Sequence, residues 1–360
     1  MIKRKKILYI ASTLESGGIT QVLYNTCKYI DYSRFKVYIL TLSPEPINSQ
    51  IEKFKKIPVH LETLNLSRIE ALIFLKHQLI NKVKEINPDI IHTSTYRPSY
   101  YAHKYLGSYK KMVSLASNLE PNYQKTYGKL LGSYIAKKEF VAFQNADIKT
   151  VVSYTLGNIY SRVSNIHVIQ NGADEQLFFK PDSDLKSKLR TKLNLNLNSK
   201  IFLSIGALTP LKDPKTLVEA FLEKMPDEND FLLILGDGPE MNDLKLKVEN
   251  HPQIQLLGFK NNPNEYLQAA DVFISCSHSE GLPNTVVEAA SCGLYCVLSD
   301  IPQHREIFEE KSGQSSFFSC SNVSELSSLL AQNIEGFADE KFSLSAKKMT
   351  NAYMNLYDLS

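Results

Sequence analysis

The chain has 360 residues, 43% of them hydrophobic and 22% charged, with a formal net charge of +3 at pH 7. This length suits two domains of ordinary size, and this composition excludes an intrinsically disordered protein. No run approaches the roughly 18 apolar residues of a membrane-spanning helix. The short N-terminal apolar run leads into a glycine-rich turn, unlike a secretory signal, and the five cysteines form no C-x-x-C pair. We therefore expect a cytoplasmic protein with reduced thiols.

The first half of the chain alternates short apolar runs with longer amphipathic segments. We expect strands at 6–11, 37–42, 112–116, 150–153 and 167–170, another ending at His92, and helices at 18–30, 67–86 and 128–143. Gly17 and Gly18 lie between the first strand and its helix, where accessible backbone amides suit a phosphate or a sugar. A tight turn between a strand and a helix needs glycine in any case. Alternation of this kind predicts a parallel sheet covered on both faces.

Polar side chains follow two of these strands. His92 ends one strand, Tyr96 and Arg97 come next in an expected loop, and Asn118 lies at the end of the strand that follows. Ligands of open α/β sheets bind beyond the carboxyl ends of the strands, so these four residues are candidates for an acceptor site. A lone histidine at a strand end is, however, more often structural than catalytic.

The second half repeats the alternation after N-G-A-D at 171–174. Strands are expected at 201–205, 231–235, 254–258, 271–277 and 295–299, then a helix capped by Glu306, and a final helix at 342–357. Asp182 and Asp184 form a D-x-D pattern, which can bind a metal, but they do not follow a strand. We interpret them as solvated side chains in a linker, and we expect no metal site.

The stretch 277–290, S-H-S-E-G-L-P-N-T-V-V-E-A-A, is expected to form a turn and then a helix that begins near Asn284. Asn284 and Thr285 are residue types that cap helices, and the start of a helix favours a phosphate. Glu280 and Glu288 can accept hydrogen bonds from sugar hydroxyls. The local pattern therefore predicts a pocket for a sugar joined to a phosphate, and the alternative is an ordinary strand–turn–helix with two surface acids.

The letters E-G-L-P-N-x-x-x-E-A in this stretch resemble the paired-glutamate motif of the retaining glycosyltransferases of the GT-B fold, family 4. Three further segments are similar to parts of that family: the glycine turn at 17–18, the G-D-G-P-E loop at 236–240, and Lys212 after the strand 201–205. The resemblance implies an α/β protein with two Rossmann-like parallel-sheet domains that face a cleft. These would be residues 1–170 and 171–341, and residues 342–360 would form a helix that returns to the first domain.

The same resemblance implies roles for individual residues. Glu280 would bind hydroxyls of the transferred sugar, Lys212 the donor diphosphate, and Glu288 the ribose, with Glu280 and Lys212 as the catalytic residues. Further donor contacts would come from the helix start and the glycine turns: Gly281, Leu282, Asn284, Thr285, Val286, Gly17, Gly18, Gly206, Gly236, Gly238 and Phe259. No enzyme nucleophile, metal or cofactor is implied. The chain departs from the family at Ala207, where an arginine is usual, and at Asn118, near which a strand-end histidine is usual.

The charge is divided unequally along the chain. Residues 1–170 carry 24 Lys or Arg against 11 Asp or Glu, a net charge of +13, whereas residues 171–360 carry 17 against 27, a net charge of −10. A basic half indicates an anionic partner, such as a lipid surface or a lipid-phosphate-linked acceptor, although plain solubility is the alternative. The expected surface comprises the helix 128–143, with Lys129, Lys137 and Lys138, together with Lys104, Lys110, Lys111 and Lys125. No nucleic-acid motif accompanies these charges, so we expect no nucleic-acid partner.

The function that the resemblance implies is the transfer of a sugar from a nucleotide-diphosphate donor, with a UDP-sugar favoured, to a glycan acceptor. The acceptor would be lipid-linked, in surface polysaccharide synthesis at the inner face of the membrane. Two alternatives remain open: a catalytically idle partner of another transferase, which the departures at Ala207 and Asn118 favour, and a nucleotide-sugar 2-epimerase. An oxidoreductase is disfavoured because neither glycine turn spells G-x-G-x-x-G.

Overall fold

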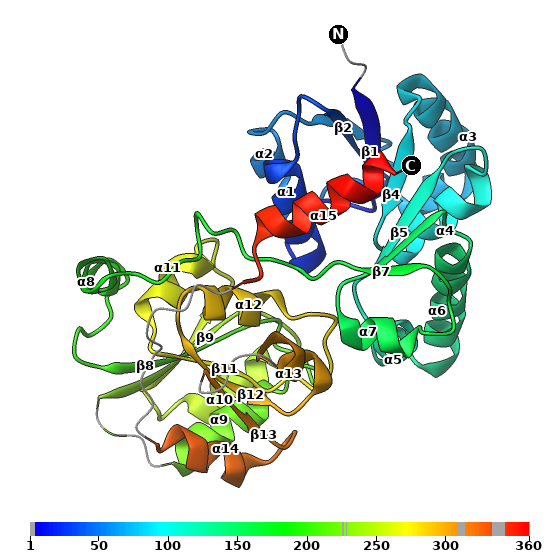
Figure 1. Cartoon of the computed structure of the whole chain (residues 1–360). Helices are drawn as coiled ribbons and strands as arrows, with labels where there is room; N and C mark the ends of the chain where they lie inside the picture. Colours follow the sequence, from blue (N-terminus) through cyan, green and yellow to red (C-terminus); the bar gives the residue numbers. More distant parts are fainter. Residues whose placement is uncertain (1–3, 225–226, 228, 309–313, 333–342, 360) are drawn as a thin grey trace. The chain divides into compact units, whose positions relative to one another are not determined.

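The computed structural model describes residues 4–224, 227, 229–308, 314–332 and 343–359. Its internal contacts divide the chain into two compact units (Figure 1). Unit 1 comprises Met1–Asn171 and Ala346–Ser360, and unit 2 comprises Gly172–Ser345. The boundaries expected from the sequence fall after residues 170 and 341, and the start of the expected final helix, at residue 342, lies outside the described residues.

Unit 1 is built on a seven-stranded parallel sheet with strand order β3-β2-β1-β4-β5-β6-β7. The strands are β1 (Lys5–Ala11), β2 (Phe35–Thr41), β3 (His60–Thr63), β4 (Ile90–Thr93), β5 (Lys111–Leu115), β6 (Ile148–Val151) and β7 (Ile166–Val168). The helices are α1 (Gly18–Tyr29), α2 (Ile51–Phe54), α3 (Arg68–Ile86), α4 (Tyr96–Tyr105), α5 (Leu119–Tyr127), α6 (Lys129–Gln144), α7 (Tyr154–Ile159) and α15 (Ala346–Asp358). The sequence did not predict β3, whose four residues are exposed or half-buried and therefore lack a buried apolar run.

Side chains of the central strand β1 alternate between two cores. Ile7 and Tyr9 belong to a core on one face of the sheet, and Leu8 and Ile10 belong to a core on the other face. This follows from the two-residue period of a strand. Helix α3 covers the second face with Leu75, Leu79, Val83 and Ile86, and it begins with a capping box between Ser67 and Glu70.

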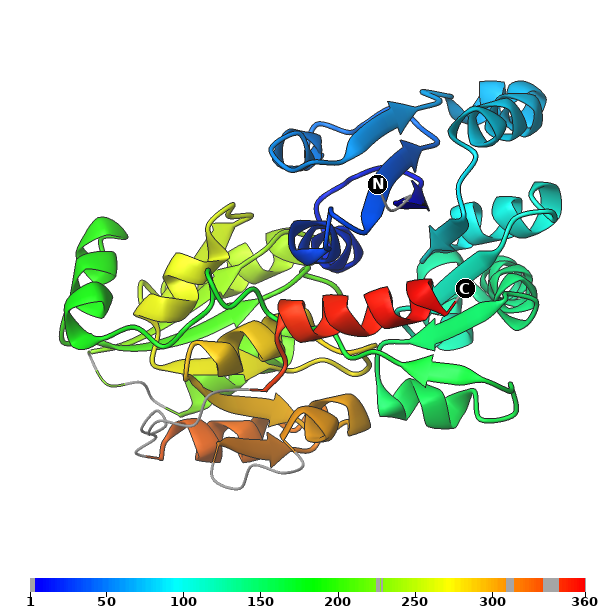
Figure 2. The same cartoon turned by 45° about the horizontal axis from the view of Figure 1, so that its top comes forward.

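Helix α15, the last of the described chain, packs on unit 1 beside α1, as Figures 1 and 2 show in two orientations. Its Met349, Tyr353 and Tyr357 are buried in the same core as Ile7 and Tyr9. The hydroxyl groups of Tyr9 and Tyr357 lie 2.6 Å apart. The expected return of the C-terminal helix to the first unit is therefore confirmed, with a helix that begins at Ala346.

Unit 2 is built on a six-stranded parallel sheet with strand order β10-β9-β8-β11-β12-β13. The strands are β8 (Lys200–Ile205), β9 (Asp230–Leu235), β10 (Ile254–Gly258), β11 (Val272–Ser275), β12 (Tyr295–Ser299) and β13 (Ser315–Phe318). The helices are α8 (Ser183–Lys192), α9 (Pro214–Glu223), α10 (Met241–Val248), α11 (Pro263–Ala269), α12 (Asn284–Ser291), α13 (Pro302–Phe308) and α14 (Val323–Leu330). Two parallel sheets with helices on their faces confirm the expected α/β class.

Two local predictions in this unit are wrong. Asp182 and Asp184 are exposed, as expected, but they do not lie in a linker, because Asp182 caps α8 by accepting a hydrogen bond from the Leu185 amide at 2.8 Å. Glu306 does not cap a helix but lies inside α13, which begins at Pro302. In the part of the chain that the structure describes, no group of three or more His, Cys, Asp or Glu side chains is placed to hold a metal ion, and no helix is long and apolar enough to cross a membrane.

Candidate functional site

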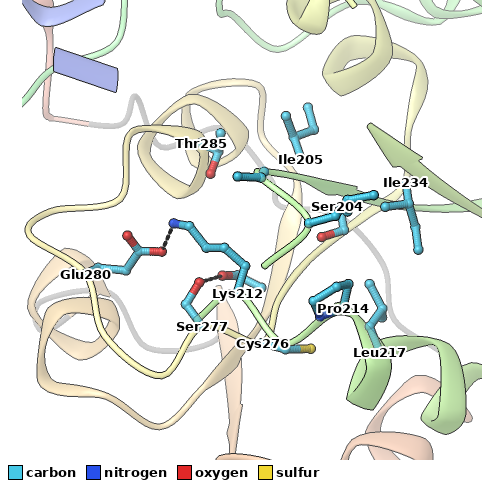
Figure 3. Close-up of a pocket in the computed structure, with 14 residues that line it drawn as sticks. Ser204, Ile205, Lys212, Pro214, Leu217, Ile234, Cys276, Ser277, Glu280 and Thr285 are labelled. Atoms are coloured by element: carbon cyan, nitrogen blue, oxygen red, sulfur yellow. Dashed lines mark hydrogen bonds and ion pairs between the residues drawn. The ribbon is translucent and has the colours of Figure 1, made fainter. Parts of the chain in front are cut away.

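The candidate site is a cavity at the carboxyl edge of the unit 2 sheet, where ligands of parallel sheets bind (Figure 3). Its walls come from the residues that follow β8 and β11 and from the start of α12. Side chains and backbone of the following residues line it: Ser204, Ile205, Gly206, Ala207, Leu208, Lys212, Pro214, Leu217, Ile234, Ser275, Cys276, Ser277, Glu280 and Thr285. The fold therefore brings Lys212 and Glu280 into one cavity together with Gly206 and Thr285.

Lys212 and Glu280 form an ion pair inside this cavity, between Nζ and Oε1 (Figure 3). The Glu280 side chain is 12% exposed and the Lys212 side chain 32% exposed. Burial by itself raises the pKa of the Glu280 carboxyl, but the Lys212 ammonium and a hydrogen bond with Ser277 outweigh it and hold that pKa below its ordinary value. The site therefore holds a carboxylate and an ammonium group side by side at neutral pH.

A second set of contacts ties the Lys212 loop to the Glu280 loop. Asp213, directly after Lys212, adopts the left-handed conformation with φ of 48°, which asparagine and aspartate tolerate best among residues with a side chain. Its carboxylate caps α9 and also lies 3.2 Å from Nε2 of His278 and 2.8 Å from the Ser321 hydroxyl. The His278 amide donates to the Leu211 carbonyl at 2.9 Å. The positions of Lys212 and Glu280 are thus coupled through their neighbours.

Two glycine turns pack against each other beside the cavity. A Cβ at Gly236, where φ is 139°, would lie 1.8 Å from the Gly206 carbonyl oxygen, and a Cβ at Gly238 would lie 2.4 Å from the Leu208 carbonyl oxygen. The Leu208 amide donates to the Asp237 carbonyl at 2.9 Å. Side chains at 236 and 238 are therefore excluded by close backbone approach, and Gly238 lines a second, shallow hollow near the end of β10. Phe259 follows that strand and is 56% exposed.

Helix α12 starts at Asn284, as expected, but its cap differs from the prediction. The N-cap position is Pro283, and no side chain of the described residues caps the helix by a hydrogen bond, so neither Asn284 nor Thr285 has that role. Thr285 instead lines the cavity. The Val286 amide donates to the Pro283 carbonyl at 3.2 Å, and an amide held in this way is less suited to a ligand.

The remaining predicted donor residues are not among the residues that line the cavity. Glu288 lies in α12 with 8% of its surface exposed, and the side chains of Leu282 and Val286 are buried, so these two could serve a ligand only through backbone groups. Gly281 lies in the turn between Glu280 and α12.

In unit 1, Gly18 begins α1. Gly17 has extended backbone, and a Cβ added to it would have no atom within 4 Å, so neither space nor φ demands a glycine at 17.

His304 is a residue near the site that the sequence did not single out. It is fully buried on α13, and its Nδ1 lies 2.8 Å from the Ser299 carbonyl oxygen, so Nδ1 carries the proton. Its Nε2 lies 3.4 Å from the Ser275 hydroxyl, which lies 3.3 Å from the Ser277 hydroxyl. Burial lowers the pKa of His304, so the ring is neutral. In the sequence, the signal that could have indicated His304 is its position just after the end of β12.

The predicted acceptor-side residues of unit 1 do not share one environment. His92 is buried, with Nδ1 2.8 Å from the Tyr357 hydroxyl and Nε2 2.6 Å from the Ser114 hydroxyl, and burial lowers its pKa to about 3. Its imidazole is therefore a neutral structural group with both nitrogens occupied. Tyr96 and Arg97 form the first turn of α4 rather than a loop, and Arg97 donates to the Ser43 hydroxyl at 3.0 Å.

Asn118 and Ala207 are the two departures from the expected pattern. Asn118 occupies the N-cap position of α5, and its side-chain oxygen lies 3.5 Å from the Tyr160 hydroxyl. Ala207 lines the unit 2 cavity, where Lys212 carries the one positive side chain among the described lining residues. Lys215 does not replace an arginine there, because it lies 3.3 Å from Glu240 and 3.1 Å from Asp243.

Family models match both halves of the chain. The model of the Glycosyl transferases group 1 matches residues 186–349, and the model of Glycosyltransferase Family 4 matches residues 16–177. The first match contains the cavity with Lys212 and Glu280, and the second contains most of unit 1.

Curated relatives are glycosyltransferases. The UDP-Gal:alpha-D-GlcNAc-diphosphoundecaprenol alpha-1,3-galactosyltransferase of Escherichia coli is 36% identical over 152 residues, which cover 40% of this chain and 38% of that protein. The O-antigen biosynthesis glycosyltransferase WclY of Escherichia coli is 23% identical, over 98% of this chain and 99% of that protein. The N-acetyl-alpha-D-glucosaminyl L-malate synthase of Bacillus anthracis is 25% identical. The chain spans 38% and 59% of the lengths of the galactosyltransferase and the malate synthase.

Solved structures share the architecture. HepE of Anabaena, in a complex with UDP, has a TM-score of 0.72 at 18% identity, over 98% of this chain and 95% of that one. Sucrose-phosphate synthase from Thermosynechococcus elongatus has a TM-score of 0.76 at 17% identity, over 99% of this chain and 100% of that one. At such identities the likeness concerns the fold, which is the GT-B fold of two Rossmann-like units. With both family models and the shared fold, the chain belongs to the family 4 glycosyltransferases.

Proposed function

We propose that this protein transfers a sugar from a UDP-sugar to a lipid-linked glycan acceptor in surface polysaccharide synthesis, with retention of the anomeric configuration. The observation that carries the proposal is the Lys212–Glu280 ion pair in a cavity at the start of α12. The relatives support the class of reaction, since they include O-antigen and diphosphoundecaprenol glycosyltransferases. HepE, which shares the fold, has been solved with UDP and with UDP-glucose.

Donor binding would exchange one ion pair for another. A diphosphate carries more negative charge than a single carboxylate, so it would draw the Lys212 ammonium away from Glu280. The Glu280 carboxylate, released from Lys212, would then accept hydrogen bonds from hydroxyls of the transferred sugar. The start of α12 adds the positive end of a helix dipole.

Catalysis would come from stabilising the leaving group. The bond between the anomeric carbon and the phosphate oxygen breaks, negative charge grows on the diphosphate, and Lys212 and the helix start are fixed in place to receive it. The acceptor hydroxyl forms the new bond on the same face of the sugar and passes its proton to the departing phosphate oxygen. Glu288 would bind the ribose, and Phe259 would lie against the base. We propose no metal, no cofactor and no enzyme nucleophile.

A second function is favoured by one observation. Ala207 leaves Lys212 as the one cation among the described residues that line the cavity, so the diphosphate would meet a single positive side chain. A partner subunit that binds a nucleotide sugar weakly and supports another transferase would tolerate this loss. A nucleotide-sugar 2-epimerase has no comparable observation in its favour.

The test is a thermal-shift series with the full chain against UDP, GDP and ADP, and then against their sugar conjugates. A ligand at a hundred times its dissociation constant stabilises the folded state by about 2.7 kcal/mol, which raises the melting temperature measurably. We expect a shift with UDP that is lost in Glu288→Ala and kept in Lys215→Ala. Membrane extracts as a source of acceptor should then release UDP from the sugar conjugate.

Each other result excludes a defined part of the proposal. A shift with UDP but no release of UDP with any acceptor extract would support the idle partner. Interconversion of nucleotide sugars without acceptor would support the epimerase. No shift with any of the three nucleotides would refute donor binding altogether.

A further inference from the structure

His304 makes two kinds of contact, one within its own segment and one toward the cavity. Its protonated Nδ1 donates to the Ser299 carbonyl oxygen at 2.8 Å. Because burial keeps the ring neutral, Nε2 carries no proton and can only accept a hydrogen bond. The Ser275 hydroxyl lies 3.4 Å from Nε2, and Ser275 lines the cavity. The first contact holds the ring in the fold, and the second extends toward the site.

Two serines continue this contact as far as the carboxylate of the cavity. The Ser275 and Ser277 hydroxyls lie 3.3 Å apart, and Ser277 forms a hydrogen bond with Glu280. A carboxylate is a stronger acceptor than a hydroxyl, so the single Ser277 proton goes to Glu280. The Ser275 proton then lies between two acceptors, Ser277 Oγ and His304 Nε2. These contacts join four side chains, which we call the His304–Glu280 network: His304, Ser275, Ser277 and Glu280.

The backbone holds the middle of this network in place. Strands β11 and β12 are neighbours, with Ser275 opposite Leu298 in the register, so Ser299 follows directly beside the end of β11. The Ser299 hydroxyl donates to the Ser277 carbonyl at 2.6 Å, and Ser277 is 1% exposed. Ser277 is thus held both through its carbonyl and through its hydroxyl. A donor fixed in this way is ready for a ligand before the ligand arrives.

Glu280 has few other partners. Among the contacts of the described residues, its carboxylate is held by Lys212 (Figure 3) and by Ser277. In the proposed reaction the donor diphosphate draws Lys212 away, so Ser277 is the partner that remains. A free glutamate side chain has several rotatable bonds, and fixing it in one orientation costs conformational entropy. The direction of the carboxylate in the donor complex therefore depends on Ser277 and on the groups that hold the Ser277 hydroxyl.

The buried histidine of unit 1 is a useful contrast. His92 Nε2 lies 2.6 Å from the Ser114 hydroxyl, which lies 2.5 Å from the Thr150 hydroxyl, and all three residues are buried. That network ends inside the core of unit 1. The network of His304 ends instead at a carboxylate that lines a cavity, so its effect reaches a ligand.

We propose that His304 is a positioning residue for the sugar of the donor. It holds the Ser275 hydroxyl, the two serines hold the Glu280 carboxylate, and the carboxylate receives hydroxyls of the transferred sugar in a fixed direction. The inference rests on the proposed function, because it requires that Glu280 binds this sugar. It goes further by assigning to His304 an effect on the sugar part of the donor and none on the UDP part.

The test separates these two parts of the donor. Calorimetric titration of the full chain measures dissociation constants for UDP, UDP-glucose, UDP-galactose and UDP-N-acetylglucosamine, and the conjugate that binds most tightly is used for the variants. His304→Leu removes the acceptor and should bind this conjugate roughly fivefold more weakly, as expected for one hydrogen bond, while its affinity for UDP stays the same. His304→Gln, whose amide can again accept from Ser275, should recover part of the loss.

A second variant breaks the network without changing the buried ring. Ser275→Ala should show the same selective loss of affinity for the conjugate. Added to His304→Leu, it should cause little further loss, because both changes break one network, whereas independent effects would multiply to roughly 25-fold. The matched control is Ser291→Ala, since the Ser291 hydroxyl donates to the Val287 carbonyl of its own helix at 2.8 Å. This control should leave both affinities unchanged.

The outcomes distinguish this inference from the proposed function. If the unchanged chain binds a conjugate and His304→Leu weakens UDP and the conjugate equally, the positioning role is overturned and the proposed function stands. A multiplied loss in the double variant overturns the positioning role as well. If His304→Leu does not fold, a selective or an equal loss in Ser275→Ala decides. Absence of binding of UDP and of every conjugate to the unchanged chain would refute the proposed function, and the positioning role with it.

Discussion

The two units share one architecture, but polar residues on or after their strands have different surroundings in the two units. In unit 1, the His92 ring lies between Tyr9 and Tyr353, with centroids 5.0 and 5.3 Å away, and Tyr357 occupies one of its nitrogens. In unit 2, Lys212 and Glu280 line a cavity at the carboxyl edge of the sheet. A polar residue on or after a strand is therefore not sufficient to mark a site, because a helix that packs over it can convert it into part of the core.

The largest expected effect is on stability, and it comes from the closely packed glycine turns of unit 2. Gly236→Ala should reduce the free energy of unfolding of unit 2 by about 3 kcal/mol, because the new Cβ would collide with the Gly206 carbonyl and φ is positive. Gly17→Ala in unit 1 is the matched change and should be nearly neutral, since nothing lies within 4 Å. Urea denaturation of both variants checks this, and equal stabilities would contradict the packing of the two turns.

Removal of the Lys212 side chain, the positive group in the cavity lining, should have the next largest effect, on donor binding. Lys212→Ala should weaken UDP binding by about 1.5–3 kcal/mol, the range for a hydrogen bond to a charged group, and should lower kcat as well. Calorimetric titration with UDP and a steady-state assay measure the two losses. Lys215→Ala, which removes a lysine paired outside the cavity, should leave both values unchanged, and an equal loss in the two variants would argue against Lys212 as the diphosphate ligand.

The buried histidine of unit 1 should make stability depend on pH. The pKa of His92 is about 3 in the folded chain against about 6.5 when unfolded, so the unfolded state binds more protons between these values. The free energy of unfolding should therefore fall by up to about 1.4 kcal/mol for each pH unit as the pH drops from 6.5 towards 3. His92→Gln should flatten this part of the profile, measured by urea denaturation at several pH values, whereas an unchanged slope would assign the effect to other groups.

The smallest expected effect concerns the contact between the Lys212 loop and the Glu280 loop. His278→Ala removes the contact of 3.2 Å with Asp213 but keeps the backbone bond to Leu211. We expect the KM for the donor to rise a few-fold, in line with about 0.5–1 kcal/mol for one hydrogen bond, with little change in kcat. His278→Asn should restore part of the affinity, and a large fall in kcat would give His278 a more direct part in the reaction.

Sequence reasoning was most successful where a structural feature depends on neighbouring residues. The alternation of apolar and amphipathic segments predicted both parallel sheets, and the turn before Asn284 predicted the start of α12. It failed at β3, whose short strand has no buried run, and at Asp182, where a helix cap was taken for a linker. Caps and short edge strands carry few residues of signal, so a one-dimensional pattern distinguishes them poorly from loops.

By itself, the sequence determined the class of fold, most of the strands, and the stretch that contains Glu280 and Glu288. Only the tertiary structure decided which distant groups meet. Lys212 and Glu280, 68 positions apart, form an ion pair because β8 and β11 are neighbours in the sheet. His92 and Tyr357, 265 positions apart, form a hydrogen bond because α15 packs on unit 1. The physical reason is that periodicity and turn chemistry act over a few residues, whereas a cavity or a buried network depends on strand order and on what packs over each strand.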